Sequence, residues 1–416
     1  PAPKASGLPA NVETLLSAEH TEWSETERQR LQSQFHTEAP ELTEAHNEIV
    51  TLKKKIPKFQ TSMVMQERSA NHARTTNLRH RGEFLQPRES VEPGVPSLLH
   101  DWPKGQAVNR LTFAQWLFEP GNPLTSRVIM NRTWQAFFGK GIVSTLEDFG
   151  YQGAQPTHPE LLDWLAVEFE ESGWDMKHIH RLIVTSATYK QSSKLSDDLK
   201  IRDPENQLLA RGPRFRVDAE MVRDIALHAS GLLKHKIGGP SVFPPQPKGV
   251  TDLAYGSGGY GTSTGADRYR RGLYTYWKRA TPYAAFMTFD APNPERTCAR
   301  RIRSNTPLQA LTLLNDEVYV EASSTLAKEL LERSELNDHE RIQEIWLRLV
   351  GRAPSETAIQ KILQYLKIET EALKKSPEAA LAITGEGQPN QITIKLAAWI
   401  LTCRAILNLD EVITKN

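Results

Sequence analysis

Cysteine and long apolar runs are scarce in this sequence. It contains only Cys298 and Cys403 among 416 residues, which is too few for a disulfide framework. We expect two free thiols, although an oxidising compartment would allow one bridge between them. No stretch approaches the roughly 20 apolar residues that a membrane helix needs, so we expect no membrane span. The apolar fraction of 39% and the nine Trp still permit an ordinary core.

The sequence also lacks a net charge of either sign. Its 51 Lys and Arg almost cancel its 50 Asp and Glu. Nucleic-acid binders and membrane-surface binders rely on a broad positive field, so the near-neutral total argues against both classes. We therefore expect no nucleic acid as a partner, although a local charged patch remains compatible with this balance.

The first residues lack the features of a signal peptide. Pro1-Ala2-Pro3-Lys4 offers neither a basic n-region nor an apolar h-region, and no initiator Met is present. We expect the chain to be a piece of a longer polypeptide. The missing targeting signal then says little about where the parent protein resides.

Familiar catalytic and cofactor motifs are absent as well. The sequence has no H-E-x-x-H, C-x-x-C, C-x-x-C-H or G-x-S-x-G pattern. His178 and His180 would point to opposite faces of a helix, so no shared metal ion is expected there. Residues 256–261 match G-x-G-x-x-G without a βαβ unit around them, which favours a Gly-rich loop over a dinucleotide site. Ser186 and Ser304 have no identifiable triad partner, so whether the chain is an enzyme stays open.

Helical periodicity dominates the chain from about residue 107. The patterns predict a mainly α fold, a large multi-helix domain with a small β-ribbon or extended arm and long loops. Four regions are expected: a helical hairpin connector over 1–60, an extended or β arm over 61–106, a helical core over 107–335, and C-terminal helices packed on that core over 336–416.

Capping residues and turn residues predict many element boundaries. Two helices are expected before Pro57, and strands over 61–65 and 75–85. The first core helices are expected from Asn122-Pro123 to Gly139, from a capping box over 157–160 to Gly173, from Asp175 to Tyr189, and from Asp218 to near Gly231. Further expected elements are a loop over 238–266, a buried strand over 273–277, one helix from Pro307 to Leu326, a helical pair over 342–350 and 356–366 joined at Gly351, a polar insert around 374–392, and a last helix over 394–407.

The strongest chemical bias lies between Ala266 and Arg303, where basic residues far outnumber acidic ones. The arginine side chain is a planar fork suited to carboxylate, phosphate or sulfate groups. One interpretation is an anion or acidic-glycan site, with Tyr274, Tyr276 and Trp277 as stacking surfaces. Its anion-binding candidates are Arg271, Arg279, Arg296, Arg300 and Arg301.

The other interpretation is structural. In it the arginines bind helix C-termini and buried carboxylates such as those of Asp148, Asp163 and Asp290. Asp148, His158 and Asp290 are also the weak catalytic candidates. His158, at the expected start of a helix, is either a general base or a structural contact.

Several long runs of this sequence are similar to one family. The runs are 122–139, 145–165, 173–189, 269–274, 289–292 and 306–315. They resemble the C-terminal domain of unknown function, the planctomycete-specific domain, of planctomycete cytochrome-type multidomain proteins. The resemblance extends from about Thr61 to Thr325 and continues more weakly to residues 408–411.

The resemblance implies an exported protein, periplasmic or at the cell surface, with a cytochrome-like module upstream in the same polypeptide. A c-type haem would then lie elsewhere in the parent chain, and no cofactor is expected in this segment. The family offers no catalytic residues to carry over.

Three functions therefore remain open. The first is a non-catalytic scaffold or interaction domain, with the upstream module, an acidic glycan or another exported protein as its partner. The second is an enzyme domain acting on an acidic or sulfated carbohydrate. The third is the substrate-side domain of a haem-linked redox enzyme. An open pocket where Asp148, His158, Arg271, Asp290 and Arg301 converge would favour an enzyme, whereas buried and mutually paired side chains would favour a scaffold.

Overall fold

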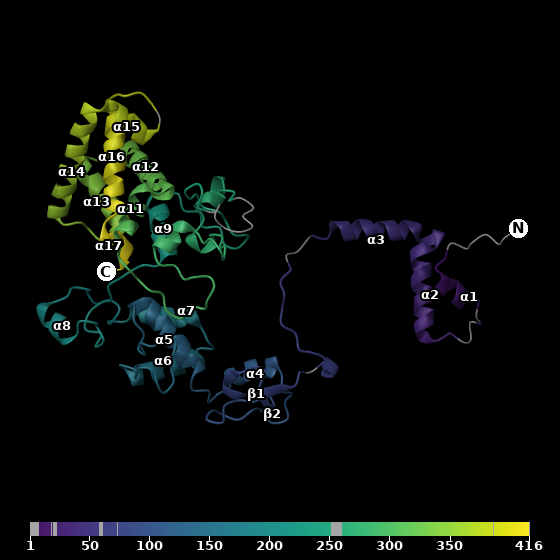
Figure 1. Ribbon diagram of the computed structural model, residues 1–416. Helices are drawn as coiled ribbons and strands as arrows, with labels where there is room; N and C mark the ends of the chain where they lie inside the picture. Colours follow the sequence, from purple (N-terminus) through teal and green to yellow (C-terminus); the bar gives the residue numbers. More distant parts are fainter. Residues whose placement is uncertain are drawn as a thin grey trace. The chain divides into compact units, whose positions relative to one another are not determined.

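The fold is mainly helical, as predicted (Figure 1). The computed structural model describes residues 8–17, 19, 23–57, 61–72, 74–250, 260–385 and 387–415. Among these residues the β structure amounts to two short two-stranded sheets. The chain forms two compact units, a smaller one of residues 1–93 with 108–110 and a larger one of residues 94–107 with 111–416. No helix in the described ranges is long and apolar enough to cross a membrane.

The smaller unit begins with three helices where two were predicted. They are α1 (Ala10–Leu16), α2 (Glu25–Glu38) and α3 (Thr43–Lys55). A capping box between Ser24 and Glu27 starts α2, and a 3-10 turn that begins at Pro40 separates α2 from α3. The hydrophobic pattern of this segment does not reveal the break between α1 and α2, which explains the wrong count.

The smaller unit also contains a two-stranded antiparallel ribbon. Its strands are β1 (Thr76–Arg79) and β2 (Pro87–Val91). A strand was predicted over 75–85, but its partner is the proline-containing segment after it, and residues 61–65 form no strand. Pro87 is tolerated because it is the first residue of β2 in a ribbon of only two strands.

The larger unit contains two separate hydrophobic cores. The first joins α5 (Thr125–Phe138), α6 (Pro159–Glu171) and α7 (Met176–Thr185) through side chains such as Trp134, Phe169 and Ile179. The second surrounds α16 (Gln391–Leu407), which is buried on nearly every side (Figure 1). Helix α16 packs against α12 (Glu317–Glu332), α14 (Glu356–Lys375) and α15 (Pro377–Thr384).

The larger unit contains further helices and strands besides these. They are α4 (Arg110–Leu117), α8 (Asp197–Arg202), β3 (Phe215–Arg216), α9 (Ala219–Ala229), α10 (Ala284–Thr288), α11 (Pro307–Asn315), α13 (Asp338–Val350), α17 (Asp410–Ile413) and β4 (Thr414–Lys415). Strand β4 pairs antiparallel with β3 and so attaches the end of the chain beside Phe215.

Predictions based on local capping are largely confirmed. Helix α5 ends at Gly139 and α13 at Gly351, both in the left-handed region at φ 78° and 76°. The Asp175 carboxylate accepts hydrogen bonds from the first backbone N–H groups of α7, although that helix ends at Thr185 and not at Tyr189. The Asn122 side chain accepts from two backbone N–H groups just before α5, which begins at Thr125.

Other predicted elements are wrong, for tertiary reasons in some places and a local reason in another. The Thr157 hydroxyl donates to the Ile142 carbonyl and forms no capping box at α6. Residues 273–277 form a 3-10 turn and an isolated bridge to Val242 where a buried strand was expected. The single helix predicted from Pro307 is two helices, because extended backbone at Asp316 ends α11 and its carboxylate caps α12.

Helix α15 lies in the segment that was predicted as a polar insert. Most of the Gly-rich loop predicted over 256–261 lies outside the described residues. Cys298 and Cys403 are both free thiols, the first exposed and the second buried.

Candidate functional site

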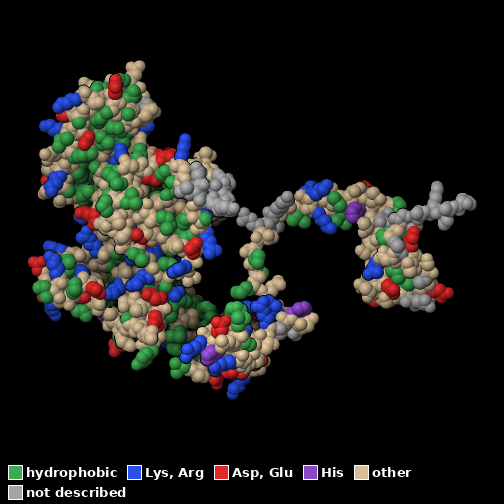
Figure 2. Space-filling view, viewed as in Figure 1, with side chains coloured by type: hydrophobic (Ala, Val, Ile, Leu, Met, Phe, Trp, Pro, Cys, Tyr) green, Lys and Arg blue, Asp and Glu red, His purple; other side chains and the backbone are tan. Residues whose placement is uncertain are grey.

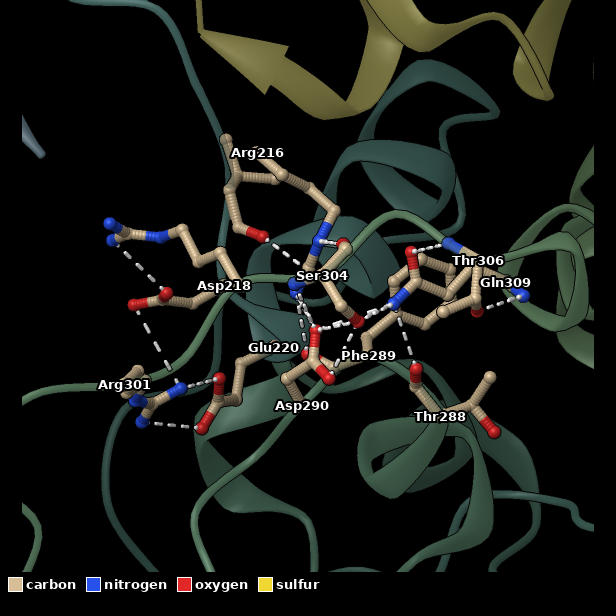
Figure 3. A network of polar contacts seen from close by, with 12 residues as sticks. Arg216, Asp218, Glu220, Thr288, Phe289, Asp290, Arg301, Ser304, Thr306 and Gln309 are labelled. Atoms are coloured by element: carbon tan, nitrogen blue, oxygen red, sulfur yellow. Dashed lines mark hydrogen bonds and ion pairs between the residues drawn. The ribbon is translucent and has the colours of Figure 1, made fainter. Parts of the chain in front are cut away.

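Asp290, within the arginine-rich segment, is the centre of a network of polar contacts (Figure 3). It follows α10 and Phe289 in a left-handed conformation, at φ 59°. Its carboxylate accepts from the Ser304 backbone N–H at 2.8 Å and from the Ser304 hydroxyl at 2.8 and 2.9 Å. Arg216 donates to it from 2.6 Å and Gln309 from 3.3 Å. These four interactions use most of the acceptor capacity of the carboxylate.

The partners of Asp290 are themselves fixed. Arg216 belongs to β3, and its buried guanidinium also donates to the carbonyls of Val217, Phe289 and Ser304. Gln309 sits in the first turn of α11, where it forms a capping box with Thr306. The network therefore joins β3, the end of α10 and the start of α11.

The electrostatics of this network keep Asp290 ionised. Burial alone would raise the pKa of the Asp290 carboxyl, but the Ser304 hydrogen bonds and the Arg216 charge outweigh it and lower that pKa below its ordinary value. Burial lowers the pKa of the Arg216 guanidinium, which nevertheless stays far above neutrality. Asp290 and Arg216 thus form a charged clamp.

The clamp closes the base of a surface loop, residues 291–303, which we call the arginine loop. Asp290 precedes the loop and Ser304 follows it, so their hydrogen bonds bring the two ends of the loop together. Compact loops with joined ends are frequent carriers of function. Along this loop runs an open groove of about 590 Å³, lined by Arg296, Arg300, Arg301, Cys298 and Glu147 among others.

Several arginines of the segment bind acidic side chains of α9 and α12. Arg301 donates to Glu220 at 2.6 and 3.0 Å, and Arg303 lies 3.4 Å from Asp218. Burial lowers the pKa of Arg301, but the two Glu220 hydrogen bonds more than reverse this and leave the pKa raised. Figure 3 shows the Arg301 and Glu220 side chains facing one another beside the clamp. The other internal pairs are Arg268 with Glu317 and Glu321, and Arg271 with Asp224.

Other cations of the segment are accessible. Arg296 and Arg279 are exposed and form no ion pair with any described residue. Arg300 lies 3.7 Å from Glu147, and both side chains are more than half exposed, so this pair contributes little. The groove therefore presents the charges of Arg296 and Arg300 to solvent, whereas Arg301 is held by Glu220.

The clamp and the arginine loop fall within a recognised family segment. Residues 109–366 match the model of the PSD1 family, which is described as "Protein of unknown function (DUF1553)". The chain belongs to the PSD1 family. No curated protein and no solved structure matches the chain. The expected resemblance to a domain of unknown function is thus confirmed.

The other two catalytic candidates lie in the PSD1 segment but do not line the groove. Asp148 accepts a hydrogen bond from the Gly150 backbone N–H at 2.7 Å, within its own turn. His158 is the residue before α6, and its Nδ1 lies 3.0 Å from the Thr157 hydroxyl. Asp163 pairs with Arg127 at 2.7 Å, outside the arginine-rich segment.

The structure thus gathers Asp290, Arg296, Arg300 and Arg301 around one groove and leaves Asp148, His158, Arg271 and Arg279 outside its lining. No group of three or more metal-binding side chains occurs among the residues that the structure describes.

The acidic partners of Arg271, Arg301 and Arg303 were missed in the sequence analysis. Asp218, Glu220 and Asp224 lie on or just before α9, spaced so that they face the segment around Arg271 and Arg301. The acidic residues in the sequence around α9 were a usable signal. Of the three, only Asp218 was considered, as the start of a helix.

Proposed function

We propose that this chain is a non-catalytic scaffold or interaction domain of an exported, cytochrome-containing multidomain protein of the planctomycete type. Its cytochrome-like module and c-type haem would lie upstream in the parent polypeptide. The family context supports an extracytoplasmic location, periplasmic or at the cell surface. The observation that carries the proposal is the closed hydrogen-bond shell of Asp290.

A general acid or base must reach the proton that it transfers. The Asp290 carboxylate is occupied by Arg216, Ser304 and Gln309, and the bonds it accepts stabilise its ionised form. The Ser304 hydroxyl donates to Asp290 and accepts from Gln309, and no histidine among the described residues is hydrogen-bonded to it. This arrangement supports a structural role for the clamp.

The arginine loop is then the proposed docking surface. Arg296 and Arg300 project from a loop whose base is fixed, so little additional ordering is needed when they bind. Paired guanidinium groups favour carboxylate and sulfate ligands. An acidic glycan or an acidic exported protein would complement this surface.

An enzyme acting on an acidic or sulfated carbohydrate is the second candidate. It is favoured by the open groove of about 590 Å³, a size typical of ligand sites, with Asp290 in its lining. Under this alternative Asp290 would have to exchange its internal partners for substrate.

The two candidates are separated by measuring binding and turnover on the same protein. Dextran sulfate is titrated against the chain and against the double variant Arg296→Glu/Arg300→Glu, with Arg132→Glu/Arg181→Glu as the matched control. Arg132 and Arg181 are also exposed and form no ion pair with a described residue. The proposal expects the first variant to bind roughly tenfold more weakly or worse, and the control to lose far less.

Turnover would decide against the proposal. Release of reducing ends from a panel of sulfated and carboxylated glycans, abolished by Asp290→Asn, would make the chain an enzyme. A visible spectrum of the full-length parent protein without haem bands would remove the cytochrome context.

A further inference from the structure

A large cavity in the larger unit lies away from the arginine loop. It measures about 1000 Å³ and opens where the two hydrophobic cores of this unit meet. Trp134, Phe138 and Ile142 of the first core form one wall, and Arg352 and Glu411, which adjoin helices of the second core, form another. Junctions between packed bodies are favoured positions for ligand sites.

Apolar side chains, closely packed against one another, form part of the cavity lining. The rings of Trp134 and Phe138 stack with centroids 4.0 Å apart, and both side chains are almost fully buried. Gly139 follows at φ 78°, where a Cβ atom would lie 2.6 Å from the Phe215 ring. Gly212 is equally restricted, because its Cβ would lie 2.3 Å from the Gln191 carbonyl oxygen. These close approaches give the cavity a fixed floor.

A tightly built loop, residues 203–211, forms the adjacent wall. The buried Asp203 carboxylate accepts from the backbone N–H groups of Gln207 and Leu208 at 2.7 and 2.8 Å. The buried Arg211 guanidinium donates to the carbonyls of Asp203 and Pro204. Asn206 and Leu209 both adopt left-handed backbone conformations, at φ 54° and 55°. Such strained residues cluster at ligand-binding positions.

Basic side chains outnumber acidic ones around the cavity. Its basic lining residues are Lys140, Lys194, Arg211, Arg214 and Arg352, and its acidic lining residues are Glu205 and Glu411. Figure 2 shows Lys and Arg side chains gathered on the face of the larger unit, between α9 and α5. A cleft with low-dielectric walls and charges of mainly one sign concentrates ligands of the opposite sign.

The cations of the rim differ in their availability. Lys140 pairs with Glu205 and Arg352 with Glu411, and Arg214 lies 2.8 Å from Asp410. Lys194 is exposed and forms no side-chain hydrogen bond or ion pair with the described part of the chain. It is therefore the cation most available to a ligand.

We propose that this cavity binds an amphipathic organic anion, a molecule with a sulfate, sulfonate, phosphate or carboxylate group on an apolar ring-bearing body. The acidic group lies against Lys194 and the rim cations. The apolar body lies on the floor formed by Trp134 and Phe138. The cavity is lined by residues of the first core and by Glu411 of α17, whose neighbours Val412 and Ile413 belong to the second core. The bound anion therefore connects the elements of the two cores and stabilises the folded larger unit. This site is independent of the arginine loop.

The probe for this site is naphthalene-2-sulfonate, which joins an anionic group to an apolar ring system. Calorimetric titration of the full chain is expected to give one bound molecule per chain, with a rise in the melting temperature. Sodium sulfate lacks the ring system and 2-naphthalenemethanol lacks the charge, so each is expected to bind roughly tenfold more weakly or worse. Equal binding of either compound would overturn the proposal, as would no binding of the sulfonate.

Matched variants locate the binding. Lys194→Glu is expected to weaken the binding of naphthalene-2-sulfonate roughly tenfold. The control Lys190→Glu makes an equal charge change at an exposed residue outside the lining, and is expected to change the affinity little. Leu195→Asn removes an exposed apolar group from the lining, with Ile201→Asn as its control. Equal effects within either pair would place the molecule elsewhere and contradict the proposal. Loss of sulfonate binding in Arg296→Glu/Arg300→Glu would place it at the arginine loop instead.

Discussion

Arg216 and Asp290 lie 74 residues apart in sequence and form an ion pair of 2.6 Å at the base of the arginine loop. The Arg216 side chain is 8% exposed and the Asp290 side chain 22% exposed, so Arg216 is the more deeply buried partner of the pair. Removing one partner of such a pair leaves the other buried charge without compensation.

Asp290→Asn tests the strength of this clamp. Asn keeps the shape of the side chain and tolerates the left-handed backbone at φ 59°, so the substitution mainly removes the charge. We expect the free energy of unfolding to fall by roughly 2–4 kcal/mol, measured by urea denaturation. Asp163→Asn, at the more exposed pair with Arg127, is expected to cost less than about 1 kcal/mol. Equal losses for the two variants would contradict the clamp.

The same ion pair predicts a pH dependence. The pKa of Asp290 is below its ordinary value of 3.8 in the folded chain, so near that pH the unfolded chain binds more protons than the folded one. The stabilisation is complete well above pH 3.8 and is lost as the pH falls through the lower folded value. The original chain and Asp290→Asn should therefore differ in their free energy of unfolding, measured by urea denaturation, and this difference should become smaller below pH 4. A difference that stays constant from pH 6 to 3 would refute this linkage.

A comparison of alanine substitutions at Gly139 and Gly351 distinguishes the cost of backbone strain from the cost of steric overlap. Both have a left-handed φ, but a Cβ atom at Gly139 would meet the Phe215 ring at 2.6 Å, whereas none lies within 4 Å at Gly351. Gly351→Ala is expected to cost about 1 kcal/mol of stability from the backbone alone. Gly139→Ala should cost about 1–3 kcal/mol more. Thermal unfolding of the two variants provides the comparison, and matching losses would show that Phe215 moves aside freely.

Lys415 predicts a second rise of stability with pH, in a higher pH range than that of Asp290. Burial lowers the pKa of the Lys415 amine to about 8 from an ordinary value of 10.5. Between these values the unfolded chain carries the extra proton, so stability contributed at this position rises as the pH rises from about 8 to 10.5. Over this pH range the free energy of unfolding of the original chain should rise relative to that of Lys415→Met. A difference that does not change with pH would rule out the linkage.

Features decided by a few neighbouring residues could be predicted from the sequence. Gly139 and Gly351 end their helices, and Asp175 caps α7, because the required groups lie within one turn. Asp218 has the same sequence signature as Asp175, but its carboxylate caps no backbone N–H group and faces Arg301 and Arg303. A tertiary partner 80 or more residues away changed the role of Asp218, and no local pattern reveals this.

The candidate site was predictable only in its composition. The excess of arginine up to residue 303 is evident in the sequence, and it drew attention to Asp290 and Arg301, which line the same groove. The sequence could not distinguish Arg301, which binds Glu220, from Arg296, which projects into solvent. That distinction depends on how α9 packs beside the loop. Arg216 itself was overlooked because it lies outside the arginine-rich segment.

Because one cysteine is exposed and the other buried, a thiol-reactive label can be attached to the arginine loop selectively. Cys403 is enclosed in the core around α16, and burial raises the pKa of its thiol, so it resists alkylation while the chain is folded. Cys298 lies exposed in the loop, and its thiol donates only to the Arg300 carbonyl. A maleimide dye or nitroxide added to the unmodified chain would therefore attach at this single position. Its signal would report directly when an acidic partner arrives at the groove, without any engineered label site.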